Sequence, residues 1–213
     1  MTFQKLSQVG ICEDLRTLSK NKQFMLILTI FVLCWGNFLS FPVLLNPLYS
    51  QFSPTKISII SICFVIAGMV GLYAIGHILD KTRKYQFCMR IITLAASSIS
   101  LGIIYVITID SVWINCVVVT FFGLFLVPIM TVAYALANRV TGTVPPAAVD
   151  GIMMCSAHVM GIVLTSLYLV VIVKANGNAG KTLSLSTVSA TLLTAFVCSL
   201  SVKQVEKSHR GLL

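Results

Sequence analysis

Residues 57–84 read ISIISICFVIAGMVGLYAIGHILDKTRK. The first part, Ile57–Leu79, contains no Asp, Glu, Lys or Arg, whereas the last five residues hold one acid and three bases. An apolar run of about 20 residues is the length that a helix needs to cross the hydrocarbon core of a bilayer. This stretch therefore predicts a transmembrane helix that ends in a charged turn at the membrane surface.

The rest of the chain repeats this pattern. Five further charge-poor runs are long enough to span a membrane: Phe24–Tyr49, Ile91–Ile109, Ser111–Asn138, Gly151–Val173 and Thr182–Val202. Backbone polar groups in lipid must be satisfied within the protein, so these runs are expected to be helices. The predicted fold is an all-α membrane protein, a six-transmembrane-helix bundle over 24–203. A segment over 1–23 precedes this bundle, and a tail over 204–213 follows it.

The composition excludes an ordinary soluble domain. Of the 213 residues, 57% are hydrophobic and only 10% are charged, whereas about 25% are charged in a typical soluble protein. The mean hydropathy is +0.96. The seven cysteines are scattered without a CxxC pair, which argues against a disulfide framework or a zinc site. We expect no metal ion and no cofactor.

The basic residues indicate how the chain is oriented. Of the fifteen Lys and Arg residues, twelve fall on one side of the expected spans: Lys5, Arg16, Lys20, Lys22, Lys81, Arg83, Lys84, Arg90, Arg139, Lys203, Lys207 and Arg210. Lys56, Lys174 and Lys181 fall on the other side. Basic residues are enriched in cytoplasmic loops, so both termini are predicted to be cytoplasmic. The net charge of +9 is then explained by topology, and nucleic acid is not an expected partner.

Aromatic residues and missing motifs add to this interpretation. Trp113, Tyr49 and Tyr168 lie near the ends of spans, where such side chains either anchor at the headgroups or pack within the protein. No charged residue lies in the middle of a span, and the sequence contains neither a HExxH pattern nor a nucleophile elbow. We therefore expect no catalytic residues and no enzymatic activity.

Prolines and polar side chains within the spans indicate where a solute could bind. The first span contains Pro42 and Pro47, and the fourth contains Pro128. Proline kinks a helix, and interrupted helices at matching positions of two helix triplets are typical of transporter sites. The kinks could also be tolerated without a substrate nearby.

Three polar side chains inside the spans are candidate cavity residues. They are Asn37 and Asn46 in the first span and His158 in the fifth. Polar groups are costly in the membrane, so each one either contacts a solute or bonds to a neighbouring helix. The second span also carries a stripe of small residues, which favours close helix packing: Ala67, Gly68, Gly71, Ala74 and Gly76.

The turn that closes the second span has the composition of a conformational latch. Gly76 is followed four residues later by Asp80 and then by Lys81, Arg83 and Lys84. An acid at this position can lie against the positive N-terminus of a neighbouring helix in one conformation and leave it in another. Alternatively, the three bases only set the orientation of the chain.

This turn resembles the loop motif of the major facilitator superfamily, in which a glycine, an acid and bases recur at similar spacing. The longer stretch IAGMVGLYAIGHILDKTRKY, Ile66–Tyr85, is similar to the feline leukaemia virus subgroup C receptor-related family within that superfamily. SFPVLLNPL, DGIMMCSAHVMG and EDLRTLSKNKQF also resemble it, at Ser40–Leu48, Asp150–Gly161 and Glu13–Phe24. The resemblance covers about residues 13–200.

The resemblance implies a fold and a function. Members of this family have twelve spans in two six-helix halves, and this chain resembles the second half, preceded by part of the central linker. They are described as carriers of choline and ethanolamine, with older links to haem export, and most are viewed as facilitators.

The resemblance also implies roles for individual residues. Gly76 and Asp80 match the loop motif and would keep its role. Asn46 and Gly151 match positions that are common in the family. This chain departs from the family pattern elsewhere: Leu39 stands where the family has a cage tyrosine, His158 where it has a substrate-contacting glutamine, and Ala135, Arg139 and Pro146 where it has glutamates.

We therefore predict a multi-pass membrane protein that acts as a facilitative carrier of a small organic solute, choline/ethanolamine-like or haem-related. The plasma membrane is favoured over an endomembrane. A single half forms one wall of a cavity, so a second six-helix half must come from upstream in the same chain, from a homodimer or from a partner carrier. The alternative is a truncated, non-transporting membrane protein that binds or modulates a full-length carrier.

Overall fold

The structure, a computed structural model, describes residues 10–109, 111–142, 144–175 and 177–202. Every regular element within these ranges is an α-helix, and six helical segments there are long and apolar enough to cross a membrane. The predicted all-α, six-span, multi-pass membrane fold is thereby confirmed. The predicted tail, 204–213, and the first nine residues of the segment 1–23 lie outside the described residues.

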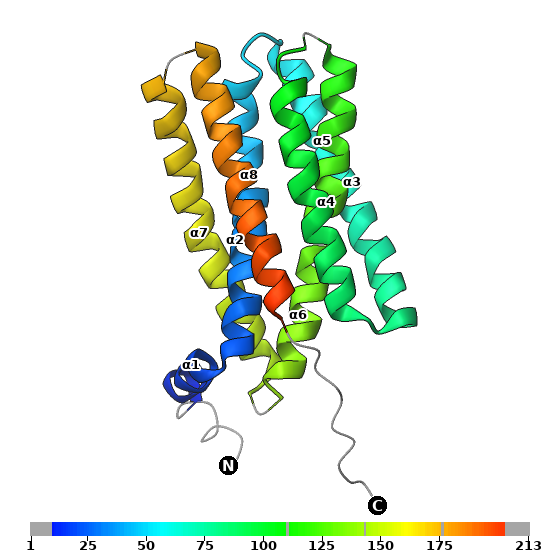
Figure 1. Ribbon diagram of the computed structural model, residues 1–213, viewed down its shortest axis with the longest axis vertical. Helices are drawn as coiled ribbons and strands as arrows, with labels where there is room; N and C mark the ends of the chain where they lie inside the picture. Colours follow the sequence, from blue (N-terminus) through cyan, green and yellow to red (C-terminus); the bar gives the residue numbers. More distant parts are fainter. Residues whose placement is uncertain (1–9, 110, 143, 176, 203–213) are drawn as a thin grey trace, which may run out of the picture.

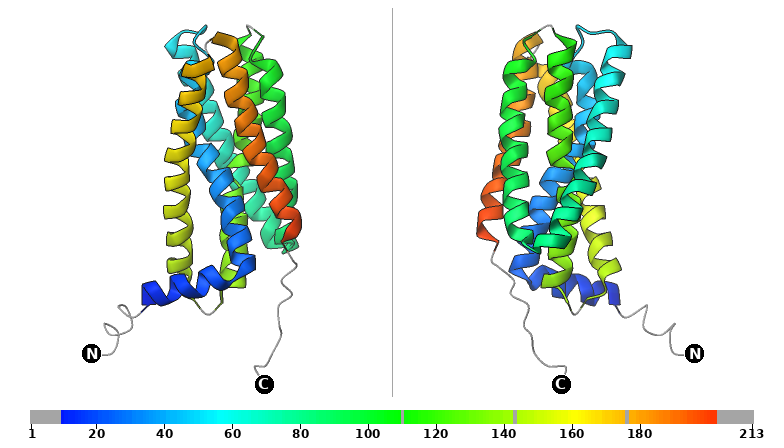
Figure 2. Two further views of the ribbon diagram at one scale, coloured as in Figure 1. Left: turned by 60° about the vertical axis from the view of Figure 1, so that its left-hand side comes forward. Right: turned by 90° about the vertical axis from the view of Figure 1, so that its right-hand side faces the viewer.

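The spans run side by side and alternate in direction (Figure 1). The helices are α1 (Gly10–Lys20), α2 (Lys22–Leu48), α3 (Pro54–Thr82), α4 (Tyr85–Val106), α5 (Val112–Leu126), α6 (Ile129–Val140), α7 (Pro146–Ala175) and α8 (Gly177–Ser201). The short helix α1 lies across one end of the bundle (Figure 2). We call this the α1 end; it also holds the α3–α4 turn, the α6–α7 connection and the last residues of α8.

Local signals explain where the first helices begin and end. The Asn21 side chain caps α2, because its Oδ1 accepts hydrogen bonds from the backbone N–H groups of Gln23 and Phe24. Pro54 begins α3. Proline lacks a backbone N–H, and at the start of a helix this group would have no acceptor within the helix. Arg83 ends α3 in the left-handed conformation, with φ 54°.

The fourth span, predicted over Ser111–Asn138 with a proline kink at Pro128, is interrupted at that proline. Helix α5 ends at Leu126 and α6 begins at Ile129, so the break falls at Val127 and Pro128. Proline has no N–H to donate to the carbonyl four residues earlier, that of Leu124. The first span differs, because α2 continues as a helix through both of its prolines.

The third span begins at Tyr85, six residues before its predicted start at Ile91. The additional turn includes Arg90, a charged residue that the sequence analysis placed outside the span. Its guanidinium donates hydrogen bonds to the carbonyl groups of Ser199, Leu200 and Val202 at the end of α8. Helix C-terminal carbonyls lack helical donors, so this arginine is paired within the bundle.

Glycines bring α3 close to α5. A Cβ placed on Gly71 would collide with the carbonyl oxygen of Leu124, and one placed on Gly68 would collide with the side chain of Val127. From the other side, a Cβ on Gly123 would collide with the carbonyl oxygen of Phe64. The small-residue stripe predicted for close packing is confirmed at Gly68 and Gly71.

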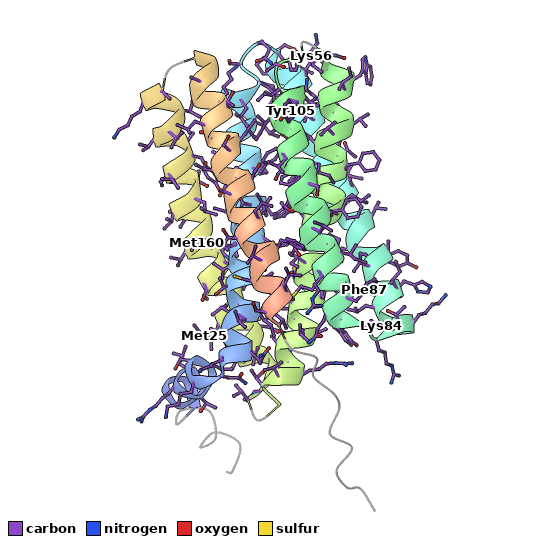
Figure 3. All side chains as sticks on the ribbon, in the orientation of Figure 1. Met25, Lys56, Lys84, Phe87, Tyr105 and Met160 are labelled. Carbon is purple, nitrogen blue, oxygen red and sulfur yellow. The ribbon has the colours of Figure 1, made fainter. Side chains whose placement is uncertain are left out.

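Charge is segregated between the two ends of the bundle. In Figure 3, Lys84 lies toward the α1 end and Lys56 at the opposite end. The described bases of the α1 end are Arg16, Lys20, Lys22, Lys81, Arg83, Lys84, Arg90 and Arg139, whereas the opposite end has Lys56, Lys174 and Lys181. The predicted asymmetry is present in the described residues. Which end faces the cytoplasm remains a prediction.

Candidate functional site

Helices α2 and α7 cross at a pair of glycines. A Cβ on Gly36 would lie 3.2 Å from Leu164 Cδ1, and one on Gly161 would lie 3.1 Å from Leu39 Cδ1, which is tighter than ordinary van der Waals contact. The Ser40 hydroxyl lies 2.7 Å from the carbonyl oxygen of Gly36 and 3.1 Å from that of Gly161. The crossing is therefore closely packed and is bridged by a hydroxyl.

His158 lies beside this crossing, in a groove of about 330 Å³. The groove is lined by Leu39, His158, Gly161, Ile162, Thr165 and Ser166. His158 is exposed, although it sits well inside a span that is otherwise apolar. An imidazole facing lipid tails would be costly, so it is expected to face a water-filled cavity or another protein surface. This groove is the best candidate for a solute site.

Asn37 is placed differently from His158. Its side chain is 1% exposed, and its Nδ2 donates to the Leu33 carbonyl at 2.7 Å and to Thr191 Oγ1 at 2.9 Å. The hydroxyl of Tyr168 donates to Asn37 Oδ1 at 2.8 Å. Both amide hydrogens are used, and the bonds join α2, α7 and α8. In this conformation Asn37 bonds neighbouring helices.

Asn46, the third candidate, is exposed near the C-terminal end of α2. It is not among the residues that line the groove of His158. The structure therefore does not bring the three candidate residues into one site.

The sequence analysis missed Tyr168 and Thr191 as partners of Asn37. It considered Tyr168 and Tyr49 as headgroup anchors or packing residues, and both are fully buried. The hydroxyl of Tyr49 has no hydrogen-bond partner among the described residues. Trp113, by contrast, is 82% exposed. Two of the three aromatic residues are therefore packing residues.

Thr165 and Ser166 in the groove were also missed. They follow His158 at seven and eight residues, which is the spacing that places side chains on the same face of a helix. This periodicity could have identified them from the sequence. Asn37 and its two partners come from three helices, and no local pattern in the sequence links them.

The turn expected to act as a latch lies at the α1 end of α3. Asp80, Lys81 and Arg83 are exposed, and Asp80 has no hydrogen-bond or ion-pair partner among the described residues. A Cβ on Gly76 would meet nothing within 4 Å. In this conformation no hydrogen bond or ion pair of Asp80 joins the turn to a neighbouring helix within the described residues, so the role of this turn stays a prediction.

Two contacts at the α1 end join α6 to its neighbours. The Arg139 guanidinium lies 3.7 Å from the centre of the Tyr85 ring and donates to its hydroxyl at 2.6 Å. Asn138 Nδ2 donates to Asp150 Oδ1 at 3.1 Å. A cation over an aromatic ring and a charged hydrogen bond are both stabilising. They tie α6 to the beginnings of α4 and α7.

A second groove lies on different residues of α2 and α7. Its volume is about 560 Å³, and its lining is Leu28, Thr29, Val32, Leu33, Cys155, Ser156, Val159, Met160 and Val163. Figure 3 shows Met160 on α7 next to α2. Thr29 and Ser156 bond to carbonyls of their own helices. The groove is thus almost entirely apolar and suits lipid tails or an apolar protein surface.

Titratable groups do not form a metal site in the part of the chain that the structure describes. No group of three or more His, Cys, Asp and Glu residues lies close enough there to hold an ion. The groove of His158 offers hydrogen-bonding groups and apolar contact through its lining residues.

Comparison with known proteins identifies relatives of this chain, although no family model matches it. It is 29% identical over 155 residues to a choline/ethanolamine transporter of Danio rerio. This match covers 70% of this chain and 31% of that protein. It is 24% identical over 188 residues to an uncharacterized MFS-type transporter of Caenorhabditis elegans. This match covers 86% of this chain and 32% of that protein.

A choline/ethanolamine transporter of Felis catus is 27% identical over 159 residues, covering 72% of this chain and 28% of that protein. The chain thus spans about a third of the length of the curated relatives it matches. These relatives are transporters and not enzymes. The chain is therefore related in sequence to the feline leukaemia virus subgroup C receptor-related transporters of the major facilitator superfamily, as its motifs predicted.

Proposed function

We propose that the chain forms the six-helix half of a facilitative carrier that moves a small organic solute by alternating access. The bundle is assigned to 24–203, with both termini in the cytoplasm and the plasma membrane as its location. The names of the relatives favour a choline/ethanolamine-like solute, and the family resemblance adds haem-related solutes.

One observation carries the proposal: a groove inside an apolar span that has three polar side chains in its lining. His158, Thr165 and Ser166 line the same cavity on α7. Intramembrane polar residues that do not bond to neighbouring helices are typical of solute paths. The groove lining contains no Asp, Glu, Lys or Arg, and we propose facilitated movement of the solute.

A second half is needed because this bundle leaves two spans largely uncovered. In their most apolar stretches, 22% of the residues of α7 and 28% of those of α3 are buried, compared with 61% for α2. The uncovered residues are mainly apolar. These faces suit lipid or a second six-helix half, provided by an upstream part of the same chain, by a homodimer or by a partner carrier.

The second candidate function is a non-transporting subunit that binds a full-length carrier and modulates it. The same uncovered faces of α3 and α7 favour it. It is also favoured by Leu39, which lines the groove where the resemblance implies a cage tyrosine. In this case the groove need not bind a solute.

The first experiment measures the length of the native transcript and of the protein on a gel. A product of about twice this length would favour the carrier, whereas a 23.2 kDa product calls for cross-linking to detect a homodimer or a partner. Uptake of labelled choline and ethanolamine is then measured in cells that express the native product.

The matched variants for this experiment are His158→Ala and Cys155→Ala, which lie three residues apart on α7. We expect His158→Ala to abolish uptake while the protein still reaches the membrane, and Cys155→Ala, in the apolar groove, to preserve it. Equal uptake by both variants would remove the site assignment. Absence of uptake by the native product, together with altered uptake by a co-expressed carrier, would favour the modulator.

A further inference from the structure

Two cysteines that are distant in the sequence meet between α3 and α5. Cys63 lies on α3 and Cys116 on α5, and the Cys116 thiol is within side-chain hydrogen-bonding reach of the Cys63 thiol. Both are free thiols in the structure. No local pattern indicates this pair, because the two cysteines lie in different spans and neither belongs to a CxxC motif.

The register of α3 against α5 explains why the two thiols meet. The spans alternate in direction, so α3 and α5 run in the same direction. Cys63 lies eight residues before Gly71. Cys116 lies eight residues before Leu124, whose carbonyl oxygen lies against Gly71. Residues eight positions apart share one broad face of a helix, so the register that places Gly71 against Leu124 also places the two cysteines together.

Glycines keep these two helices close along the same contact. A Cβ on Gly123 would collide with the carbonyl oxygen of Phe64, the residue that directly follows Cys63. A disulfide requires two Cα atoms about 4.4–6.8 Å apart. Helices in membranes come this close where small residues let their backbones approach. The contact between α3 and α5 therefore suits a disulfide.

The surroundings of the pair determine which oxidants can reach it. Both cysteines are half-buried, and the adjacent Ile62 and Val117 are 57% and 54% exposed. The pair lies within apolar spans, so this surface faces lipid tails or another apolar surface. A charged oxidant such as glutathione disulfide is costly to place there, whereas a small uncharged hydroperoxide can enter.

We propose that Cys63 and Cys116 form a dithiol site that hydroperoxides oxidise to a disulfide joining α3 to α5. One sulfur attacks the O–O bond and takes the terminal OH group, while its proton passes to the leaving oxygen. The products are a sulfenic acid and an alcohol, or water when the oxidant is hydrogen peroxide. The second sulfur then attacks the sulfenic sulfur and closes the S–S bond, and the hydroxyl group leaves as water with the second thiol's proton. The two thiols are oxidised and the hydroperoxide is reduced.

The disulfide would fasten α5 to α3 without fastening α6. Cys116 lies before the break at Val127 and Pro128, and α6 begins after that break. Exchange with a thiol reductant would reverse the bond. The site goes beyond the proposed carrier function and does not depend on it, because it rests only on the packing of two helices.

The test uses the native protein in nanodiscs of saturated lipid, which does not form hydroperoxides of its own. Separate samples receive hydrogen peroxide, cumene hydroperoxide as the lipid-soluble probe, or glutathione disulfide. The remaining thiols are blocked with N-ethylmaleimide, and disulfide-linked peptides are identified by mass spectrometry without reduction. We expect both hydroperoxides to produce a peptide that links Cys63 to Cys116 within one chain, and glutathione disulfide to produce none.

Matched variants connect the linked peptide to this pair. Cys63→Ala and Cys116→Ala should each abolish it, and either variant decides the test if the other fails to fold. Cys198→Ala removes a half-buried thiol from α8 and should leave the amount of linked peptide unchanged.

The outcomes separate the dithiol site from its oxidant and from transport. Absence of the linked peptide with both hydroperoxides, or equal linkage of either cysteine to a third one, would overturn the site. Equal linkage by glutathione disulfide would overturn the requirement for an uncharged oxidant. Linkage by cumene hydroperoxide alone would support the site with an oxidant from the bilayer, and linkage by hydrogen peroxide alone would support it with an oxidant from water. Uptake is not measured, so failure of the proposed function would leave this inference standing.

Discussion

Replacement of Gly71 by alanine tests the helix contact on which the bundle depends. Gly71 lies on α3, and the methyl group of an alanine there would collide with the Leu124 carbonyl oxygen and lie 3.0 Å from Pro128 Cγ. Pro128 has no N–H, so the Leu124 carbonyl lacks its usual hydrogen-bond donor within the helix. Its oxygen lies against Gly71. A backbone atom cannot rotate away as a side chain can, so α3 and α5 would have to separate.

The expected magnitude combines two opposing effects. Alanine in place of glycine in a helix gains about 1 kcal/mol of helix propensity. Overpacking of a close contact costs about 1–3 kcal/mol, and the upper value applies here because the obstacle is the backbone of a second helix. The net loss for Gly71→Ala is about 2 kcal/mol. Gly76→Ala, on the same helix, meets nothing within 4 Å and should gain about 1 kcal/mol.

The assay is thermal unfolding of both purified variants in the same detergent, followed by tryptophan fluorescence and size-exclusion chromatography. For a domain of this size, about 2–4 °C in Tm corresponds to 1 kcal/mol. Gly71→Ala should therefore unfold about 4–8 °C below the wild type, and Gly76→Ala about 2–4 °C above it. Equal Tm values for the two variants would refute the close contact between α3 and α5.

Three further predictions address the buried network, the latch and the orientation. Tyr168→Phe leaves Asn37 Oδ1 without its donor and should cost about 1 kcal/mol in the same unfolding assay; an unchanged Tm would contradict the network. Asp80→Asn should reduce uptake by the native product while its surface amount stays constant, and normal uptake would leave the turn as a topology signal only. In a cysteine-free background, Lys56→Cys should react with an impermeant maleimide on intact cells and Lys84→Cys only after permeabilisation; the reverse result would invert the predicted orientation.

The spans could be predicted from the sequence because their signal is local. A run of apolar residues matched to the bilayer thickness defines each one. The predicted start of the third span erred because a tertiary contact lowers the cost of placing Arg90 within the helix. Helix α4 begins early because Arg90 finds the carbonyls at the end of α8. The fourth span breaks at Pro128, whereas α2 continues through Pro42 and Pro47.

The candidate site could be predicted only in part. The cost of a polar residue in a membrane drew attention to Asn37, Asn46 and His158, yet cost alone does not tell which direction a side chain faces. The structure buries Asn37 among hydroxyl groups of other helices, exposes Asn46 and places His158 in a groove. The rotation of each helix about its axis decides whether a side chain is buried between helices, exposed or placed in a groove.

The sequence by itself determined the class of the protein, the number of its spans and the segregation of its charges between the two ends. These features follow from hydrophobic length and from the position of Lys and Arg, which act along the chain one segment at a time. Only the tertiary structure decided which faces of the spans meet. Lipid-facing and protein-facing residues of a membrane helix are almost equally apolar, so hydrophobicity does not set helix rotation. The glycine contacts and the few buried hydrogen bonds do, and they arise only when helices distant in sequence come together.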